Sequence, residues 1–463
     1  MKVSHKEWPI LVVGDIAAFV LALFLTLLIR YADVPSEGLF IMHLYPFSFL
    51  FLVSIFIFFT AGLYEKHTSF LKRELPGTVI AAQIVNVVLA ATFFFFIPYF
   101  GIAPKTNLAI YLTVSSVLVM LWRFFLFPLF EFKNREEAII IGSGKELLEL
   151  TEEINANRRY RLKCVQSIDL AKVGNPNDVQ AQVLKKVMSG EVSTIIADTN
   201  GAHADMLVPL FYNLTFVQSQ VHIVNFSKVY EEAFDRIQPS QVSHEWLLEN
   251  LTLDRRPLYE TAKRLVDIIF SIPILVVTAL VTPLVFVVVR LEGPGPLFIL
   301  QERMGQNGKK IRVRKFRTMT ANEQSAWIGE TTNKVTKVGA FLRKTSIDEL
   351  PQVLAVLKGD VSFIGPRSDV VGLAERLAEA IQFYNARYKV VPGISGWAQI
   401  NQRYAPGKIS PQSIEESRLR LAYDLYYVKH RSLLLDLSIA LRTIKTLITR
   451  LIPQYKKKHD TKH

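Results

Sequence analysis

Cysteine is almost absent from this chain of 463 residues, since Cys164 is the only one. A single thiol excludes an intramolecular disulfide and any zinc site built from several cysteines. Charge is also sparse, at 21% of residues, and 41 acidic side chains face 54 basic ones. This basic surplus suits an anionic partner, such as a lipid surface, a phosphorylated substrate or nucleic acid.

A cleavage pattern of small residues is missing after the first apolar run, so we expect that run to be retained as a membrane span. Apolar runs are what the chain has in abundance, because half of its residues are hydrophobic and 31 are phenylalanine. Each run of about twenty residues can cross ~30 Å of hydrocarbon as a helix. Four such runs predict a four-span α-helical bundle within residues 1–133: Pro9–Ile29, Leu39–Leu63, Gly77–Phe100 and Leu108–Phe127.

Basic residues gather on one side of these four runs. They stand before the first run, between the second and third, and at the close of the fourth: Lys2, Lys6, Lys66, Lys72, Arg73, Arg123, Lys133 and Arg135. The other two loops hold only Lys105, so the positive-inside rule places both ends of the bundle in the cytoplasm. Asp15 lies inside the first run. It is either a functional charge or one that sits near the interface or faces a neighbouring helix.

Residues 134–250 change to a soluble pattern, in which the short apolar strands 138–141, 163–168, 192–197 and 220–224 are interspersed with helical sequence. This pattern predicts a Rossmann-like, parallel, doubly wound sheet. Gly142-Ser-Gly144 follows the first strand, but Leu147 replaces the third glycine of a dinucleotide fingerprint. Asp169 stands where a ribose-binding acid would be expected. The segment either binds a nucleotide or serves regulation or assembly, with glycines kept for a tight turn.

A linker is predicted at His244–Pro257, and a fifth apolar run follows at Leu265–Leu291. Asp267, Pro273 and Pro283 interrupt this run. A proline inside a helix lacks its N–H and promotes a kink. The run is therefore either a plain fifth span or, as we favour, a re-entrant helix over about 262–291 that leaves the membrane on the side where it entered.

Two adjacent carboxylates, Asp348 and Glu349, follow a strongly basic stretch. Within it, 311–317 reads as a half-buried strand and 337–345 as a short amphipathic helix. Carboxylates among such cations could attack an anionic substrate or hold a metal. Alternatively, Ser346-x-x-Glu349 is a capping box that starts a helix. Pro351 weakens the second interpretation, because proline is comfortable only in the first helical turn.

Several motifs of the C-terminal part occur together. They are Lys263-Arg264-x-x-Asp267, Gly-Pro-Gly-Pro296, Gln301-Glu-Arg303-x-Gly305, Lys315-Phe-Arg-Thr-Met319, Thr345-Ser-Ile-Asp-Glu-Leu-Pro-Gln352, Leu357-Lys-Gly-Asp-Val-Ser-Phe-Ile-Gly-Pro-Arg367, Pro392-Gly-Ile-Ser-Gly-Trp397 and Asp424-x-x-Tyr427. This order closely resembles the bacterial sugar transferase family, the polyprenyl-phosphate hexose-1-phosphate transferases or monotopic phosphoglycosyl transferases. The resemblance runs from about Tyr259 to the last helical stretch. The preceding spans and Rossmann-like segment are similar to the large, WbaP-like branch.

The resemblance implies that residues 251–463 form a mixed α/β catalytic domain with the re-entrant helix. It implies transfer of a sugar 1-phosphate from a UDP-sugar to undecaprenyl phosphate in the bacterial inner membrane, with Mg²⁺ as cofactor. Asp348 matches the nucleophile and Glu349 the residue that helps to hold the metal. Arg367 matches the nucleotide contact, and Arg303, Lys315 and Arg317 are further phosphate-binding candidates. A homodimer is among the assemblies that this resemblance allows.

Two positions depart from the family pattern. Ser368 replaces the second proline of a Pro-Arg-Pro motif, which puts the nucleotide contact in question. The membrane break, commonly Ser-Pro, is expected here at Thr282-Pro283. A non-catalytic membrane scaffold is the alternative function. Nucleic acid is not an expected partner, because the basic residues are interleaved with a membrane segment and lack aromatic stacking motifs. The tail Lys456-Lys-Lys458 suits an anionic membrane surface or a solubilising terminus.

Overall fold

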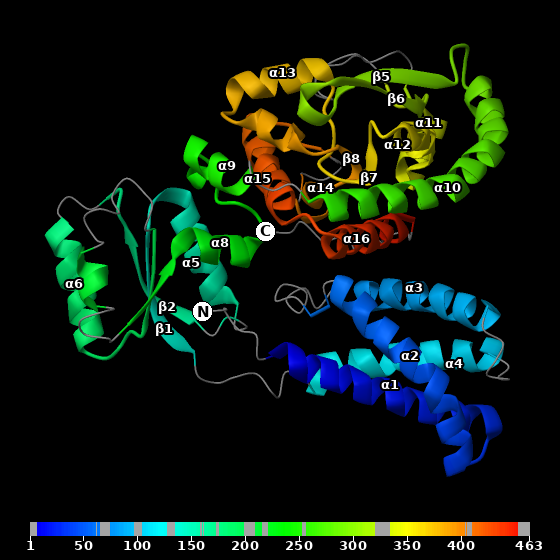
Figure 1. The fold of residues 1–463 in the computed structure, drawn as a ribbon, viewed down its shortest axis with the longest axis horizontal. Helices are drawn as coiled ribbons and strands as arrows, with labels where there is room; N and C mark the ends of the chain where they lie inside the picture. Colours follow the sequence, from blue (N-terminus) through cyan, green and yellow to red (C-terminus); the bar gives the residue numbers. More distant parts are fainter. Residues whose placement is uncertain are drawn as a thin grey trace, which may run out of the picture. The chain divides into compact units, whose positions relative to one another are not determined.

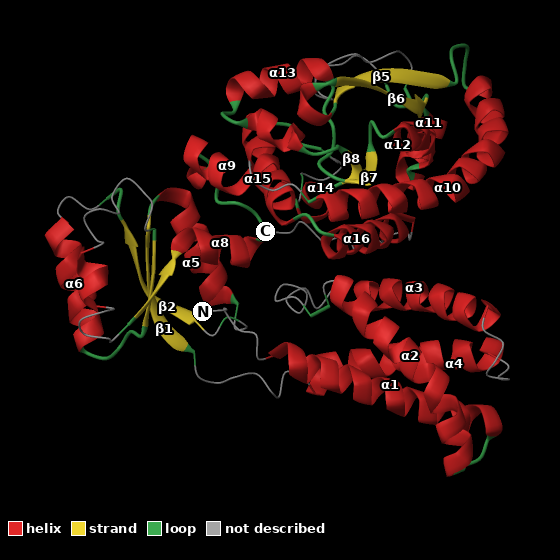
Figure 2. Cartoon of the chain, in the orientation of Figure 1, coloured by secondary structure: helices red, strands yellow, loops and turns green. Residues whose placement is uncertain are grey.

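A computed structural model describes residues 7–451, except 62, 65–74, 97–103, 127–134, 158–159, 161, 173–175, 199–208, 215–220, 252–255, 320–333, 403 and 405–409. The chain divides into two compact units, Met1–Gln241 and Val242–His463. The predicted cations Lys2, Lys6, Lys66, Lys72, Arg73, Lys133 and Lys456–Lys458 lie outside the described residues. Figure 2 shows that the described part is mainly helical, with short strands in both units.

The predicted apolar runs of the first unit form helices α1 (Glu7–Tyr31), α2 (Glu37–Thr60), α3 (Leu75–Phe96) and α4 (Pro104–Leu121). A π-helical turn, Trp122–Leu126, ends the last of them. Among the described residues, three segments are long and apolar enough to cross a membrane: Ile10–Tyr31, Glu37–Phe59 and Pro257–Leu291. Val79–Thr92 and Asn107–Leu121 are shorter apolar helices. These helices indicate a membrane protein.

Asp15 faces neighbouring chain segments inside the helical bundle. Its carboxylate is fully buried and lies 2.5 Å from the Arg123 guanidinium, and the Tyr64 hydroxyl donates to it at 2.8 Å. Arg123 also donates to the carbonyl of Leu63. Paired charges avoid the cost of an isolated ion in a membrane. Arg123, in the turn that ends α4, is therefore a buried partner of Asp15.

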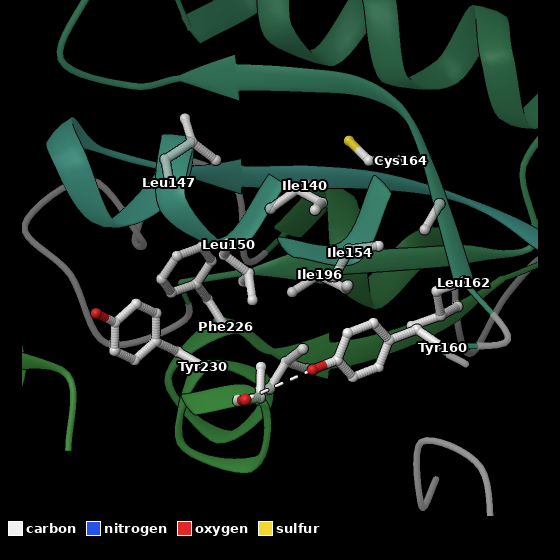
Figure 3. Close-up of a cluster of buried hydrophobic side chains, with 13 residues drawn as sticks. Ile140, Leu147, Leu150, Ile154, Tyr160, Leu162, Cys164, Ile196, Phe226 and Tyr230 are labelled. Carbon is white, nitrogen blue, oxygen red and sulfur yellow. Dashed lines mark hydrogen bonds between the residues drawn. The ribbon is translucent and has the colours of Figure 1, made fainter. Parts of the chain in front are cut away.

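A four-stranded parallel sheet makes up the rest of the first unit, with strand order β2-β1-β3-β4. The strands are β1 (Glu136–Gly142), β2 (Leu162–Asp169), β3 (Thr194–Ala197) and β4 (His222–Asn225). Helices α5 (Gly144–Ala156) and α8 (Phe226–Phe234) pack on one face, where Ile140, Leu150 and Phe226 form a buried cluster (Figure 3). Helix α6 (Pro176–Met188) covers the other face (Figure 1).

The glycine turn after β1 is bonded by acidic side chains of the chain itself. Asp169 Oδ1 accepts from the backbone N–H groups of Gly144 and Ala171, at 3.4 and 3.1 Å. Glu146, in the first turn of α5, accepts from the N–H of Ser240 and the side chain of Gln238. Carboxylates there add negative charge where the phosphate of a nucleotide would approach the helix N-terminus. Nucleotide binding by this segment stays a prediction.

The second unit begins with a helix where the sequence predicted a linker. Helix α9 (His244–Leu251) shows that the linker prediction is wrong over these residues. Trp246 is buried, and the Lys429 ammonium lies 5.8 Å from the centre of its ring. Packing against a later helix, α15 (Ile414–His430), therefore orders this segment.

Helix α10 (Pro257–Leu291) runs through both of its internal prolines without interruption. Figure 1 shows that it turns in its C-terminal half. Pro283 has no N–H to donate to the carbonyl of Ala279, and the neighbouring Thr282 hydroxyl donates to the Thr278 carbonyl at 2.6 Å. Thr282 and Pro283 thus lie in a bent but continuous helix. Of the most apolar 18-residue stretch of α10, 17% is buried, against 44% of the corresponding stretch of α1.

The remaining elements form a mixed α/β domain. Strands β5 (Phe298–Met304) and β6 (Lys310–Phe316) are antiparallel, and β7 (Ser362–Ile364) and β8 (Gly393–Ser395) are parallel. The predicted helix at 337–345 is confirmed as α11 (Lys337–Thr345). A 3₁₀ segment, η8 (Ile347–Gln352), leads into α12 (Val353–Lys358). The later elements are α13 (Val371–Ala380), η9 (Tyr384–Lys389), α14 (Trp397–Asn401), α15 and α16 (Leu433–Leu451).

Candidate active site

A pocket of about 570 Å³ lies in the second unit. It brings together five residues that the sequence singled out: Arg303, Lys315, Asp348, Glu349 and Arg367. Apolar side chains from α10, α13 and α16 line it as well, among them Ile274, Leu373 and Leu447. The lining of the pocket therefore combines charged and apolar side chains.

The carboxylate pair lies on η8, directly after α11. Ser346 ends α11 in the left-handed conformation, with φ 58° and ψ 17°, and its side chain makes no capping hydrogen bond. The capping-box interpretation is therefore wrong. Pro351 explains the difference, because it disfavours an α-helix that would start at Ser346, whereas the tighter η8 accommodates it. The α-helix starts only at Val353.

Asp348 is 8% exposed, yet its carboxylate accepts no hydrogen bond from the residues that the structure describes. Burial raises the pKa of this carboxyl above its ordinary value, although the Lys315 ammonium opposes the shift. A carboxylate without hydrogen bonds keeps its lone pairs available for attack. The site therefore offers a nucleophile at this position.

Glu349, the neighbouring acid, is held by two cations. Its Oε1 lies 2.8 Å from Nζ of Lys315 and 2.5 Å from Nη2 of Arg367. Burial opposes ionisation, but Arg367 and Lys315 outweigh it and hold the pKa of Glu349 well below its usual range. Glu349 is thus an anion fixed in place, while Asp348 beside it is not.

The basic pocket residues that the sequence singled out come from the β5–β6 hairpin and the loop after β7. Lys315 is largely buried at the end of β6, and burial lowers the pKa of its ammonium to about 8. Arg303, on β5, donates to the Gln301 side chain and to the Ser368 carbonyl. Burial lowers the pKa of Arg303 to about 10. Both side chains therefore remain cationic at neutral pH and can face an anionic substrate.

Arg317 lies outside the lining of this pocket. Its guanidinium donates to three backbone carbonyls at the C-terminal end of α10, those of Val289, Gly293 and Pro294. These bonds satisfy carbonyls that a helix end leaves without partners. The contacts point to a structural role, and phosphate binding by Arg317 stays a prediction without support from them.

Sequence reasoning missed Arg343, which lines the pocket from α11 and donates to the Thr318 hydroxyl at 2.9 Å. Its place in the basic stretch just before the carboxylate pair was the available signal. Reasoning also missed a buried ionic cluster of Asp369, Arg387, Arg420 and Asp424 behind the Gly-Pro-Arg loop. Only the Asp424 motif hinted at it, because the other members are scattered along the chain.

Ser368, the departure from Pro-Arg-Pro, is 6% exposed. Its backbone carbonyl accepts from Arg303 at 2.7 Å, and the next residue pairs with Arg420 and Arg387. These contacts on the residues after Arg367 restrain the loop despite the missing proline.

The sequence pattern that describes bacterial sugar transferases matches residues 258–450. A UDP-N-acetylgalactosamine-undecaprenyl-phosphate N-acetylgalactosaminephosphotransferase of Aeromonas hydrophila is 38% identical over 199 residues, which are 42% of this chain and 45% of that protein. An undecaprenyl-phosphate glucose phosphotransferase of Komagataeibacter xylinus is 30% identical over 322 residues, or 66% of this chain and 58% of that protein. The chain thus spans about half the length of these two relatives.

A shorter relative is covered almost completely. The exopolysaccharide production protein PSS of Rhizobium leguminosarum is 35% identical over 195 residues, which are 41% of this chain and 96% of that protein. The similarity to this relative and the family pattern point to the same part of the chain, which contains the pocket and its carboxylate pair. This chain therefore belongs to the bacterial sugar transferase family.

Proposed function

We propose that this protein transfers a sugar 1-phosphate from a UDP-sugar to undecaprenyl phosphate, forming undecaprenyl-diphospho-sugar and UMP. The observation that carries the proposal is the contrast between the two acids of η8. Asp348 has no hydrogen bond among the described residues, whereas Glu349 is clamped by Lys315 and Arg367. A buried nucleophile among cations suits attack on a diphosphate.

The chemistry proceeds in two displacements. A carboxylate oxygen of Asp348 attacks the phosphorus that carries the sugar, the bond from that phosphorus to the bridging oxygen breaks, and UMP leaves. A phosphate oxygen of undecaprenyl phosphate then attacks the acyl phosphate, and the Asp348 carboxylate departs. Splitting one displacement into two is the usual gain from covalent catalysis. Arg367, Lys315 and Arg303 would hold the phosphate charges during both steps.

The carboxylate pair also fits Mg²⁺, which proteins commonly bind through one or two carboxylates while substrate phosphates and water complete the shell. The described residues contain no group of three acidic, histidine or cysteine side chains that could hold a metal alone. Glu349 would supply the protein ligand, as the resemblance implies, while Asp348 beside it would remain available for attack. Bound Mg²⁺ would neutralise charge on the diphosphate and on the departing UMP.

Four membrane spans and a re-entrant α10 would place the pocket at the cytoplasmic face of the bacterial inner membrane. Both ends of α10 contact the same domain: the Asp267 carboxylate accepts from Ser362 and Phe363, and Val289 packs with Phe316 and Leu342. A straight helix would separate Asp267 from Val289 by about 33 Å. The bend instead brings the apolar segment back, and its exposed Leu280 and Leu284 would face lipid.

The topology is tested with single cysteines reacted with an impermeant maleimide in intact cells. Lys310→Cys, on the soluble hairpin, should react only after the inner membrane is permeabilised, whereas Asp33→Cys, between α1 and α2, should react from the periplasm. The native Cys164 is buried, so its background should be low. Labelling of Lys310→Cys from the periplasm would contradict the re-entrant helix, and protection of Asp33→Cys would contradict the four-span arrangement.

The activity is tested by incubating membranes that contain the full chain with undecaprenyl phosphate and one UDP-sugar at a time. UDP-glucose, UDP-galactose and the UDP-N-acetylhexosamines form the panel, because the matched relatives are named for different sugars. We expect UMP release with at least one donor, which would assign the chain to the first step of exopolysaccharide, capsule or O-antigen assembly. Release from none would favour the alternative, a non-catalytic membrane scaffold.

A further inference from the structure

The largest fully buried side chain in the described part of the protein is an arginine, Arg387. It lies behind the pocket with no exposed surface, and it pairs with the carboxylates of Asp369 and Asp424. Arg420, 7% exposed, pairs with Asp369 at 2.9 Å. The hydroxyls of Tyr384 and Tyr388 each donate to Asp369 at 2.9 Å.

This cluster forms hydrogen bonds with the backbone next to the pocket. Nη2 of Arg387 and Nη2 of Arg420 both donate to the carbonyl oxygen of Arg367, at 2.7 and 2.6 Å. The Asp369 carboxylate, two residues further along, accepts from Arg387, Arg420 and the two tyrosine hydroxyls, while Asp424 accepts from Nε of Arg387 at 2.8 Å. The main chain is therefore held on both sides of Ser368, and the Arg367 side chain projects from this anchored loop to Glu349.

Stability alone is a weak reason for such a cluster. Removing several ions from water costs free energy that their mutual attraction often fails to recover, and apolar replacements of buried ion pairs are frequently as stable. What the ions provide is geometry, because a planar guanidinium holds a carboxylate and a carbonyl at fixed angles. Both arginines donate to the same backbone carbonyl, that of Arg367, so the fixed geometry acts on the backbone of this residue.

We propose that Arg387 and Arg420 are positioning residues that fix the backbone of Arg367, so that its guanidinium meets the phosphates of the nucleotide. The inference rests on the proposed function, since it assumes that Arg367 binds a UDP-sugar. Arg387 is not among the residues that line the pocket, whereas Arg420 is, so the proposal requires that Arg420 also acts on binding through the Arg367 backbone and not by its own contact with the nucleotide. Their effect on binding should pass entirely through Arg367.

A double-mutant cycle on UDP affinity, measured by calorimetry with the detergent-solubilised full chain, tests this. Arg420→Lys keeps a positive charge beside Asp369, but one ammonium cannot reproduce the fixed fork that joins Asp369 to the Arg367 carbonyl. We expect it to weaken UDP binding about tenfold in the wild-type background and to have no further effect in the Arg367→Ala background. The proposal would be overturned if Arg420→Lys weakened UDP binding equally in both backgrounds, or in neither.

Lys263→Gln provides the matched structural control. Lys263 pairs with Asp436 in a separate polar cluster of the same unit, so its effect on UDP affinity should be equal in both backgrounds. If Arg420→Lys does not fold, Tyr388→Phe takes its place in the cycle. We expect Tyr388→Phe to weaken UDP binding about threefold in the wild-type background only. Lack of UMP release by the wild type counts against the proposed function, whereas additivity in the cycle with normal release counts against this inference alone.

Discussion

Asp348→Asn is expected to lower UMP release by about a thousandfold or more, because the amide cannot attack phosphorus and the covalent route is lost. The variant should still fold, since the wild-type carboxylate accepts no hydrogen bond from the described residues that an amide would forfeit. UMP release from membranes with the active UDP-sugar is the measurement. Asp360→Asn is the control, because Asp360 pairs with Lys358 outside the pocket.

The same variant separates two ways of losing activity. When undecaprenyl phosphate is omitted, wild-type protein incubated with a UDP-sugar labelled in the sugar should acquire label, whereas Asp348→Asn should not. Release by Asp348→Asn within about tenfold of the wild type would exclude a nucleophilic role. Equal losses in Asp360→Asn and Asp348→Asn would indicate a general effect on folding instead.

The activity should decline above about pH 8 as Lys315 loses its proton, because the pKa of this buried ammonium is about 8 in the folded protein. Below that pH the cation faces the substrate phosphates and pairs with Glu349. Above it, kcat/KM should fall by up to about tenfold per pH unit, as expected for loss of one essential proton from the free enzyme. The measurement is a profile of kcat/KM between pH 6.5 and about 10.

Arginine at the same position gives the decisive comparison. Lys315→Arg keeps its charge throughout this range, so the alkaline decline should disappear or move to higher pH, even if the maximal rate is lower. The free energy of unfolding should change with pH in the opposite direction to the activity. Burial lowers the pKa of Lys315 from 10.5 in the unfolded chain to about 8 in the folded protein. Its charged form therefore lowers the stability of the wild type below about pH 8, and this cost disappears as the pH rises towards 10.5. A decline with the same midpoint in Lys315→Arg would contradict the assignment.

Local patterns accounted for much of the fold. The apolar runs, the alternating β6 strand and the amphipathic α11 were predicted close to their observed limits, because their periodicity is carried by adjacent residues. Helix α9 was missed for the opposite reason. Its order depends on Trp246 packing near Lys429, a contact that joins positions far apart in the sequence.

The candidate site shows the same division. The motifs around Asp348, Glu349 and Arg367 directed attention to the right residues, but they could not distinguish Lys315 from Arg317, two residues later. Packing separates them, since Lys315 reaches Glu349 whereas Arg317 reaches the end of α10. The capping box failed because Ser346 adopts a left-handed conformation, and of the local sequence only Pro351 argued against a helix that starts there.

By itself, the sequence determined which family the chain resembles, which stretches are apolar enough for a membrane, and which acidic pair to examine. These properties follow from residue type and short spacing. Tertiary structure alone decided that Asp348 and Glu349 differ in their bonds, that Asp15 is neutralised by Arg123, and that Arg387 and Arg420 converge on the Arg367 carbonyl. Such pairings join residues far apart in the chain, and burial strengthens their electrostatics, so only the folded arrangement specifies them.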